Sequence, residues 1–128
     1  MSSRHSRPRL FVYGTLRRGF ENRHAHLLDR SARYLGTARV QGRLYDLGQY
    51  PGIRLADNPD QWVTGDLFRL RNAEAILAAL DEYEGSEFAR VPAIAALPSG
   101  ERVPCWVYEY KPEVAEERRI VSGVYSSS

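Results

Sequence analysis

The chain has 128 residues, of which 43% are hydrophobic and 27% charged, and its formal net charge is +2. One globular domain of ordinary composition fits this length, and the proportions exclude a disordered chain, a collagen and a coiled coil. No apolar run reaches the roughly 18 residues that a membrane-spanning helix needs, and the N-terminal residues lack the apolar stretch of a secretory signal. We therefore expect a cytoplasmic protein that does not act at a membrane.

The basic residues are unevenly placed, because Arg4, Arg7 and Arg9 all precede the first apolar run. The remainder of the chain is close to neutral, and its basic residues are interspersed with acidic ones. This distribution does not favour a nucleic-acid partner. The single cysteine, Cys105, lies in the apolar run CWVYEY with no cationic neighbour to lower its pKa. A buried structural thiol is therefore favoured over a nucleophile.

Most segments carry strand signals, and only one carries a strong helix signal. Residues 1–8 and 126–128 are polar and are expected to be tails around a single domain at 9–125. Gly48, Pro51-Gly52 and residues 57–59 are expected to form turns, and residues 98–100 a hairpin turn. The expected elements are a strand at 10–13, a weak helix at 24–28, strands at 34–40, 42–46 and 62–70, a helix at 72–85, and strands at 91–97 and 103–110.

The helix begins after Asn72, a good N-cap residue, and ends at Gly85, a good C-terminal stop. Its predicted buried stripe has helical spacing and consists of Ile76, Leu77, Leu80 and Tyr83. Many short strands combined with one strong helix predict an α+β domain. We expect a small mixed β-sheet that curls into a barrel-like core with few flanking helices.

Glu84 is the candidate catalytic residue. It follows Leu80 by four residues and Leu77 by seven, so it falls on the apolar stripe of the helix. It also lies in the last turn, where the helix dipole disfavours a negative charge. Both effects raise the pKa of a carboxyl group toward the range that a general base needs near neutral pH. The alternative is a border residue whose stem packs while its head reaches water; Asp81 and Glu82 are assigned to solvent.

A second candidate site follows the first strand, at Tyr13, Gly14, Thr15 and Leu16. Free backbone N–H groups in such a loop could bind a carboxylate or an oxyanion, although an ordinary strand-end turn explains the segment equally well. The segment lacks the glycine pattern of a nucleotide-binding loop. Tyr50 and Pro51 are expected in a turn that could place an aromatic wall beside a ligand.

No metal site is expected from the histidines. His24 and His26 are two residues apart, so they would point in different directions on a helix, and no further ligands stand at metal-binding spacing.

These segments together resemble the gamma-glutamylcyclotransferase-like superfamily, in particular its AIG2-like, gamma-glutamylamine cyclotransferase branch. The resemblance extends from about residue 10 to 125 and rests on YGTL at 13–16, YPG at 50–52, GDLF at 65–68 and LDEYEG at 80–85. It implies a small barrel with flanking helices. It also implies cyclisation of a small gamma-glutamyl amine or amino acid to 5-oxoproline, without a cofactor. The size and near-neutral charge of the domain are compatible with a monomer or a weak homodimer.

The resemblance further implies roles for individual residues. Glu84 would be the general acid and base, and the backbone from Tyr13 to Leu16 would hold the gamma-glutamyl head, with Tyr50 and Pro51 at the border of its pocket. Two residues depart from the family pattern, in which a tyrosine is common where Phe88 stands and an acidic residue is common where Val124 stands. These departures bear on the leaving-group side of the substrate.

Two other functions fit the same features. One is a non-catalytic module that binds a carboxylate-bearing small molecule or a protein tail in the same cleft. The other is an amide hydrolase in which Glu84 activates an external water. The carboxylate of Glu84 favours an enzyme over a binder of acidic ligands, because it would repel such a ligand.

Overall fold

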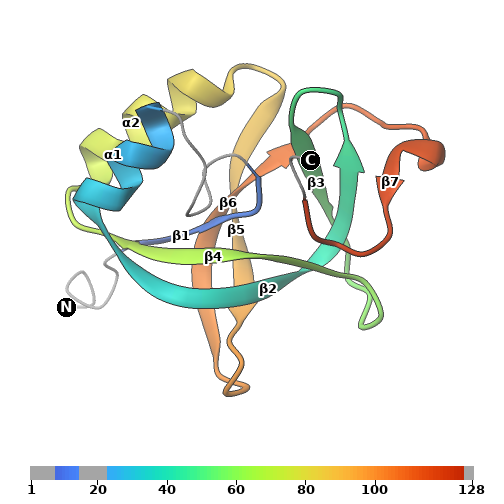
Figure 1. Ribbon diagram of the computed structural model, residues 1–128, viewed down its shortest axis with the longest axis horizontal. Helices are drawn as coiled ribbons and strands as arrows, with labels where there is room; N and C mark the ends of the chain where they lie inside the picture. Colours follow the sequence, from blue (N-terminus) through green and yellow to red (C-terminus); the bar gives the residue numbers. More distant parts are fainter. Residues whose placement is uncertain (1–7, 15–22, 126–128) are drawn as a thin grey trace.

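The computed structural model describes residues 8–14 and 23–125, which form a closed barrel with two helices on one side (Figure 1). The strands of the barrel follow one another around it in the order β1 (Arg9–Val12), β4 (Trp62–Leu70), β2 (Ala32–Asp46), β3 (Pro51–Leu55) and β6 (Arg102–Tyr110). The ring closes because β6 also pairs with β1, at Leu10 and Trp106. The sheet is mixed, since β6 runs parallel to both β1 and β3. The predicted α+β fold, with a mixed sheet curled into a barrel, is confirmed.

Two further strands extend the barrel. The strand β5 (Phe88–Ala96) forms a hairpin with β6 and also pairs with the middle of β2. Near the C-terminus, a 3₁₀ turn, η2 (Glu116–Arg118), leads into the short strand β7 (Arg119–Ile120), which pairs with the end of β2. The hairpin prediction across residues 98–100 is confirmed.

The strand β2 is a single continuous strand, although the sequence predicted two. It is long enough to pair first with β4, up to Gln41, and then with β3 from Gly42 onward. A register shift between Tyr34 and Gly36 bends it, and Gly36 has a positive φ of 125°. Because the bent strand β2 pairs with β4 along its first part and with β3 along its last part, it curves the sheet into a barrel.

The hydrophobic core has two parts. One fills the barrel and includes Phe11, Ile53 and Leu67, all of which are at most 1% exposed. The other lies between the barrel and the helices α1 (Arg23–Ser31) and α2 (Ala73–Glu84), around Leu28 and Leu80. The helices lie next to each other in Figure 1, and α2 ends beside the hairpin formed by β5 and β6.

The helix α2 follows the prediction closely, since it begins after Asn72 and ends before Gly85, which has a φ of 84°. Its residues Ile76, Leu77 and Leu80 are buried as expected. Tyr83 is not buried, because it is 44% exposed. The predicted burial of Tyr83 is therefore wrong.

The prediction of a turn at Pro51-Gly52 is also wrong, because both residues begin β3. The chain reverses before them, where Leu47 N–H donates to the carbonyl of Tyr50 and Gly48 N–H donates to the side chain of Asp46. Proline can occupy the first position of a strand, since no ladder hydrogen bond requires its missing N–H there. Within residues 8–14 and 23–125, no helix is long and apolar enough to cross a membrane.

Candidate active site

A cavity of about 430 Å³ opens where the end of β1, the start of β3 and the last turn of α2 meet. It brings together five of the predicted site residues, which come from distant parts of the chain: Tyr13, Gly14, Tyr50, Pro51 and Glu84. The other two, Thr15 and Leu16, lie outside the described residues. The cavity wall is completed by residues including Gln49, Tyr83, Phe88 and Tyr108.

Glu84 is the last residue of α2 and lies on the wall of this cavity. Its side chain is partly withdrawn from water, and this burial raises the pKa of Glu84 from 4.5 to about 7. The last turn of α2 carries no basic residue that would oppose the shift. A carboxyl group with this pKa is present in both protonation states near neutral pH, so it is suited to accept a proton and to return it.

Tyr13 lines the cavity, and its hydroxyl group joins three strands. The hydroxyl donates a hydrogen bond of 2.6 Å to the main-chain oxygen of Tyr108 and accepts one of 3.2 Å from the N–H of Ile53. The side chain is buried, and this burial raises the pKa of Tyr13. Because the only proton of the phenol is used within the protein, Tyr13 holds the end of β1 against β3 and β6.

Replacing Tyr13 by Phe should therefore lower the free energy of unfolding by about 1–3 kcal/mol, because two main-chain groups lose a buried partner. Chemical denaturation measures this difference, with Tyr50→Phe as the control because Tyr50 is 41% exposed. Equal stability of the Tyr13→Phe variant and the unmodified protein would contradict the structural role of this hydroxyl.

The contact between Gly14 and Pro51 explains why glycine follows the tyrosine at the end of β1. A Cβ atom on Gly14 would lie 2.8 Å from Cγ and 2.9 Å from Cδ of Pro51, closer than such atoms pack. The absence of a side chain lets the chain leave β1 directly against the start of β3. Tyr13 and Gly14 are therefore neighbours of the segment YPG at the cavity wall.

Part of the cavity wall is aromatic. The ring of Phe88 lies 6.0 Å from that of Tyr50 and 5.2 Å from that of Tyr110, measured between centroids. Of the two residues that depart from the family pattern, Phe88 faces the cavity, whereas Val124 is 41% exposed and is not among the residues that line it. Substitution at the position of Phe88 thus acts on the cavity directly.

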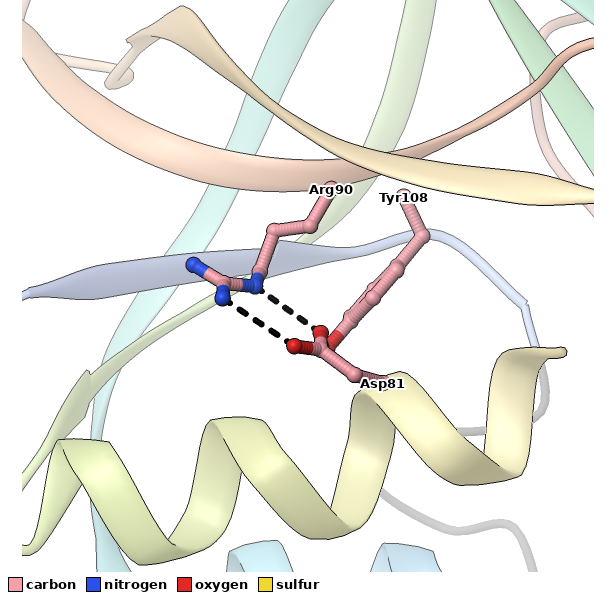
Figure 2. A network of polar contacts seen from close by, with 3 residues as sticks. All are labelled: Asp81, Arg90 and Tyr108. Carbon is pink, nitrogen blue, oxygen red and sulfur yellow. Dashed lines mark hydrogen bonds and ion pairs between the residues drawn. The ribbon is translucent and has the colours of Figure 1, made fainter. Parts of the chain in front are cut away.

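Asp81 was assigned to solvent, and its side chain is indeed 42% exposed, but both of its oxygens are engaged (Figure 2). Arg90 binds it through two hydrogen bonds, with Nε 2.9 Å from Oδ1 and Nη2 3.0 Å from Oδ2. The Tyr108 hydroxyl donates to Oδ1 at 2.6 Å. Hydrogen bonding from Arg90 lowers the pKa of Asp81, and burial raises the pKa of Tyr108.

The sequence analysis missed this cluster because its members come from α2, β5 and β6, and helix periodicity says nothing of partners on strands. The available signal was that Asp81 falls in LDEYEG at 80–85, one of the segments that carry the family resemblance.

Cys105 is buried as predicted, and burial raises the pKa of its thiol to about 12. The thiol is therefore protonated at neutral pH and is not a nucleophile. Among the residues that the structure describes, no group of three or more His, Cys, Asp and Glu side chains is arranged to hold a metal ion.

Comparison with solved structures identifies the fold. The chain is 25% identical to an AIG2-like protein from Mus musculus, with a TM-score of 0.75 over 94% of this chain and 88% of that one. It is 23% identical to YkqA from Bacillus subtilis, with a TM-score of 0.73. That alignment covers 92% of this chain but only 39% of YkqA, which is longer. A structure described as a gamma-glutamyl cyclotransferase is 22% identical, with a TM-score of 0.63 over 80% of this chain and 66% of that one.

Comparison with the curated proteins gives no match. The sequence itself matches the family described as gamma-glutamyl cyclotransferase, AIG2-like, over residues 10–127. This match includes every residue that forms the cavity, and the barrel has the fold of the AIG2-like protein from mouse. The chain therefore belongs to the gamma-glutamyl cyclotransferase, AIG2-like family.

Proposed function

We propose that this protein is a gamma-glutamyl cyclotransferase, which converts a gamma-glutamyl amine or amino acid into 5-oxoproline and the free amine. Membership of the family supports a cyclotransferase type of enzyme. The observation that carries the proposal is Glu84, a carboxyl group whose pKa is about 7, on the wall of a cavity next to the end of β1. The cavity volume of about 430 Å³ suits a small molecule.

The proposed reaction needs one base that later acts as an acid. The carboxylate of Glu84 takes a proton from the α-ammonium group of the gamma-glutamyl head. The free amine then attacks the γ-carbonyl carbon of the same molecule and closes a five-membered lactam ring. As the bond to the leaving nitrogen breaks, Glu84 returns the proton to that nitrogen, and the ring nitrogen gives up its second proton to solvent, so the products are 5-oxoproline and an amine.

The cavity would assist mainly by holding the substrate in a bent conformation. Nucleophile and electrophile belong to one molecule, so orientation removes much of the entropic barrier. General base catalysis adds roughly 10²–10⁴-fold. We propose that backbone N–H groups in the segment Tyr13 to Leu16 bind the α-carboxylate of the substrate or the developing oxyanion. Tyr50 and Pro51 would lie beside the gamma-glutamyl head.

The pH dependence of the reaction tests the role of Glu84. Its raised pKa means that the base is lost as the pH falls through about 7, so kcat/KM should decline tenfold per pH unit below that value. A glutamate of ordinary pKa would remain active down to about pH 4.5. A profile of kcat/KM from pH 5 to 9 measures the midpoint, and a rate that stays constant down to pH 5 would contradict the assignment.

Glu84 also distinguishes the alternatives. A module that binds acidic ligands gains nothing from a carboxylate in its cleft, because at pH above 7 that group repels the ligand. A hydrolase could use the same base with an external water. The two enzymes differ in product, since hydrolysis gives glutamate and cyclisation gives 5-oxoproline.

A further inference from the structure

We propose that Asp81 is a positioning residue for the reaction proposed above: by binding Tyr108 and Arg90 together, it fixes the last turn of α2, and with it Glu84, against the cavity. The inference rests on the proposed function for its kinetic consequences. In structural terms, we infer that the Asp81–Arg90 ion pair and the hydrogen bond from Tyr108 stabilise the C-terminal turn of α2.

The geometry of the cluster supports this role. Asp81 lies three residues before Glu84, so both belong to the final turn of α2. Figure 2 shows Arg90 and Tyr108 reaching Asp81 from the two strands of the β5–β6 hairpin. Arg90 is itself held in place, since its guanidinium lies 4.6 Å from the centroid of the Trp106 ring. The helix end is thereby attached to both strands of the β5–β6 hairpin.

Tyr108 connects this attachment to the cavity. Its side chain is only 4% exposed, and it shares the cavity wall with Glu84. Its hydroxyl donates to Asp81, while its main-chain oxygen accepts from the hydroxyl of Tyr13. The hydroxyl of Tyr13 in turn accepts from Ile53 N–H. One continuous series of hydrogen bonds thus runs from α2 through β6 to β1 and β3, around the cavity.

The last turn of α2 needs such an attachment. Leu80 is the last fully buried residue of the helix, and Tyr83 beyond it is 44% exposed. The final main-chain hydrogen bond, from Gly85 N–H to the carbonyl of Asp81, is long at 3.3 Å. Helix ends with little buried apolar surface fray, and fraying would let water reach Glu84. The contacts of Asp81 oppose this.

At the end of β1 and on β6, Tyr13 and Tyr108 line the same cavity as Glu84. Burial raises the pKa of each phenol, and the charge of Glu84 raises it as well, so both are neutral at pH 7. Neither phenol therefore supplies a negative charge near Glu84 when the charge of Asp81 is removed.

The test compares Asp81→Asn with Glu82→Gln. Both variants remove one negative charge from neighbouring exposed positions of α2, but only Asp81 contacts Arg90 and Tyr108. The first readout is the pKa of Glu84, measured by NMR of ¹³C-labelled carboxyl groups and assigned with a Glu84→Gln sample. In Asp81→Asn it should fall by about one pH unit or more toward 4.5, because the carboxyl group becomes hydrated. In Glu82→Gln it should not change.

The second readout is kinetic. A displaced base should lower kcat by roughly 10–100-fold in Asp81→Asn, with a smaller change in KM, since small misplacements act mainly on the chemical step. Tyr108→Phe, which removes only the hydroxyl, should show the same direction in both readouts. The double variant should be little worse than Asp81→Asn alone if the two groups act through their shared hydrogen bond.

The two proposals fail in different ways. If no gamma-glutamyl compound is cyclised, the proposed function fails, and the fall in the Glu84 pKa in Asp81→Asn still supports the positioning role. If folded Asp81→Asn and Tyr108→Phe both leave the pKa of Glu84 unchanged, the positioning role is overturned whatever the activity. Should Asp81→Asn not fold, Tyr108→Phe decides the question alone.

Discussion

Glu84→Gln should reduce turnover by roughly 10²–10⁴-fold while the fold and ligand binding persist. Glutamine has nearly the same shape and can still form hydrogen bonds, but it cannot accept a proton from the α-ammonium group. The measurement is kcat at pH 8, with Glu82→Gln as the matched control because Glu82 lies two residues away on the exposed side of α2. Near-normal kcat in Glu84→Gln would remove Glu84 from the mechanism.

The same substitution should change stability in a way that depends on pH. In the folded protein the pKa of Glu84 is about 7, above its ordinary 4.5, so folding favours the protonated form. Its contribution to stability is complete below about pH 4.5 and is lost as the pH rises through 7. Glu84→Gln stays neutral and should therefore be more stable than the unmodified protein at pH 8, by roughly 1–3 kcal/mol. At pH 4 the two free energies of unfolding should agree.

Urea denaturation at both pH values checks this without any substrate. Equal stability of the two proteins at pH 8 would mean that Glu84 is well hydrated, which would contradict its proposed burial and its suitability as a base at neutral pH.

Gly65→Ala should destabilise the barrel by about 3 kcal/mol or more, since it forces an atom into a filled space. A Cβ atom on Gly65 would overlap the main-chain oxygen of Val12 and approach the ring of Phe11 to 2.8 and 3.0 Å. These atoms belong to β1, whose pairing with β4 helps to close the ring. For a domain whose net stability is of order 5–15 kcal/mol, the loss is a large fraction of the whole.

The control is Gly100→Ala, at the tip of the β5–β6 hairpin. Gly100 has a positive φ of 94°, but a Cβ atom there meets nothing within 4 Å. Its replacement should cost about 1 kcal/mol, the strain of that backbone conformation alone. Thermal unfolding ranks the two variants. If Gly65→Ala were no less stable than Gly100→Ala, β1 would not lie as close to β4 as described.

Elements set by local signals could be predicted from the sequence. The alternation in 62–70 gives β4 with both of its ends, and the capping residues and apolar spacing give α2. The same spacing indicates Glu84, because a residue's place on a helix face depends only on its distance from the neighbouring apolar residues.

Features set by contacts between distant segments could not be predicted in this way. Nothing near Gly42 signals that β2 continues while its partner changes from β4 to β3. Tyr83 fits the apolar stripe but is 44% exposed at the cavity, so its burial depends on what the rest of the fold places beside the end of α2. Likewise the partners of Asp81 are fixed by the approach of the β5–β6 hairpin to the end of α2, which no helical pattern records.

The central claim, that Glu84 drives cyclisation of a gamma-glutamyl compound, is tested most directly by mass spectrometry of the products in ¹⁸O-labelled water. The purified protein and its Glu84→Gln variant are incubated with a panel of gamma-glutamyl amines and gamma-glutamyl peptides. We expect 5-oxoproline without ¹⁸O, together with the free amine, from the unmodified protein alone. Glutamate carrying ¹⁸O, or 5-oxoproline formed equally by folded Glu84→Gln, would contradict the claim.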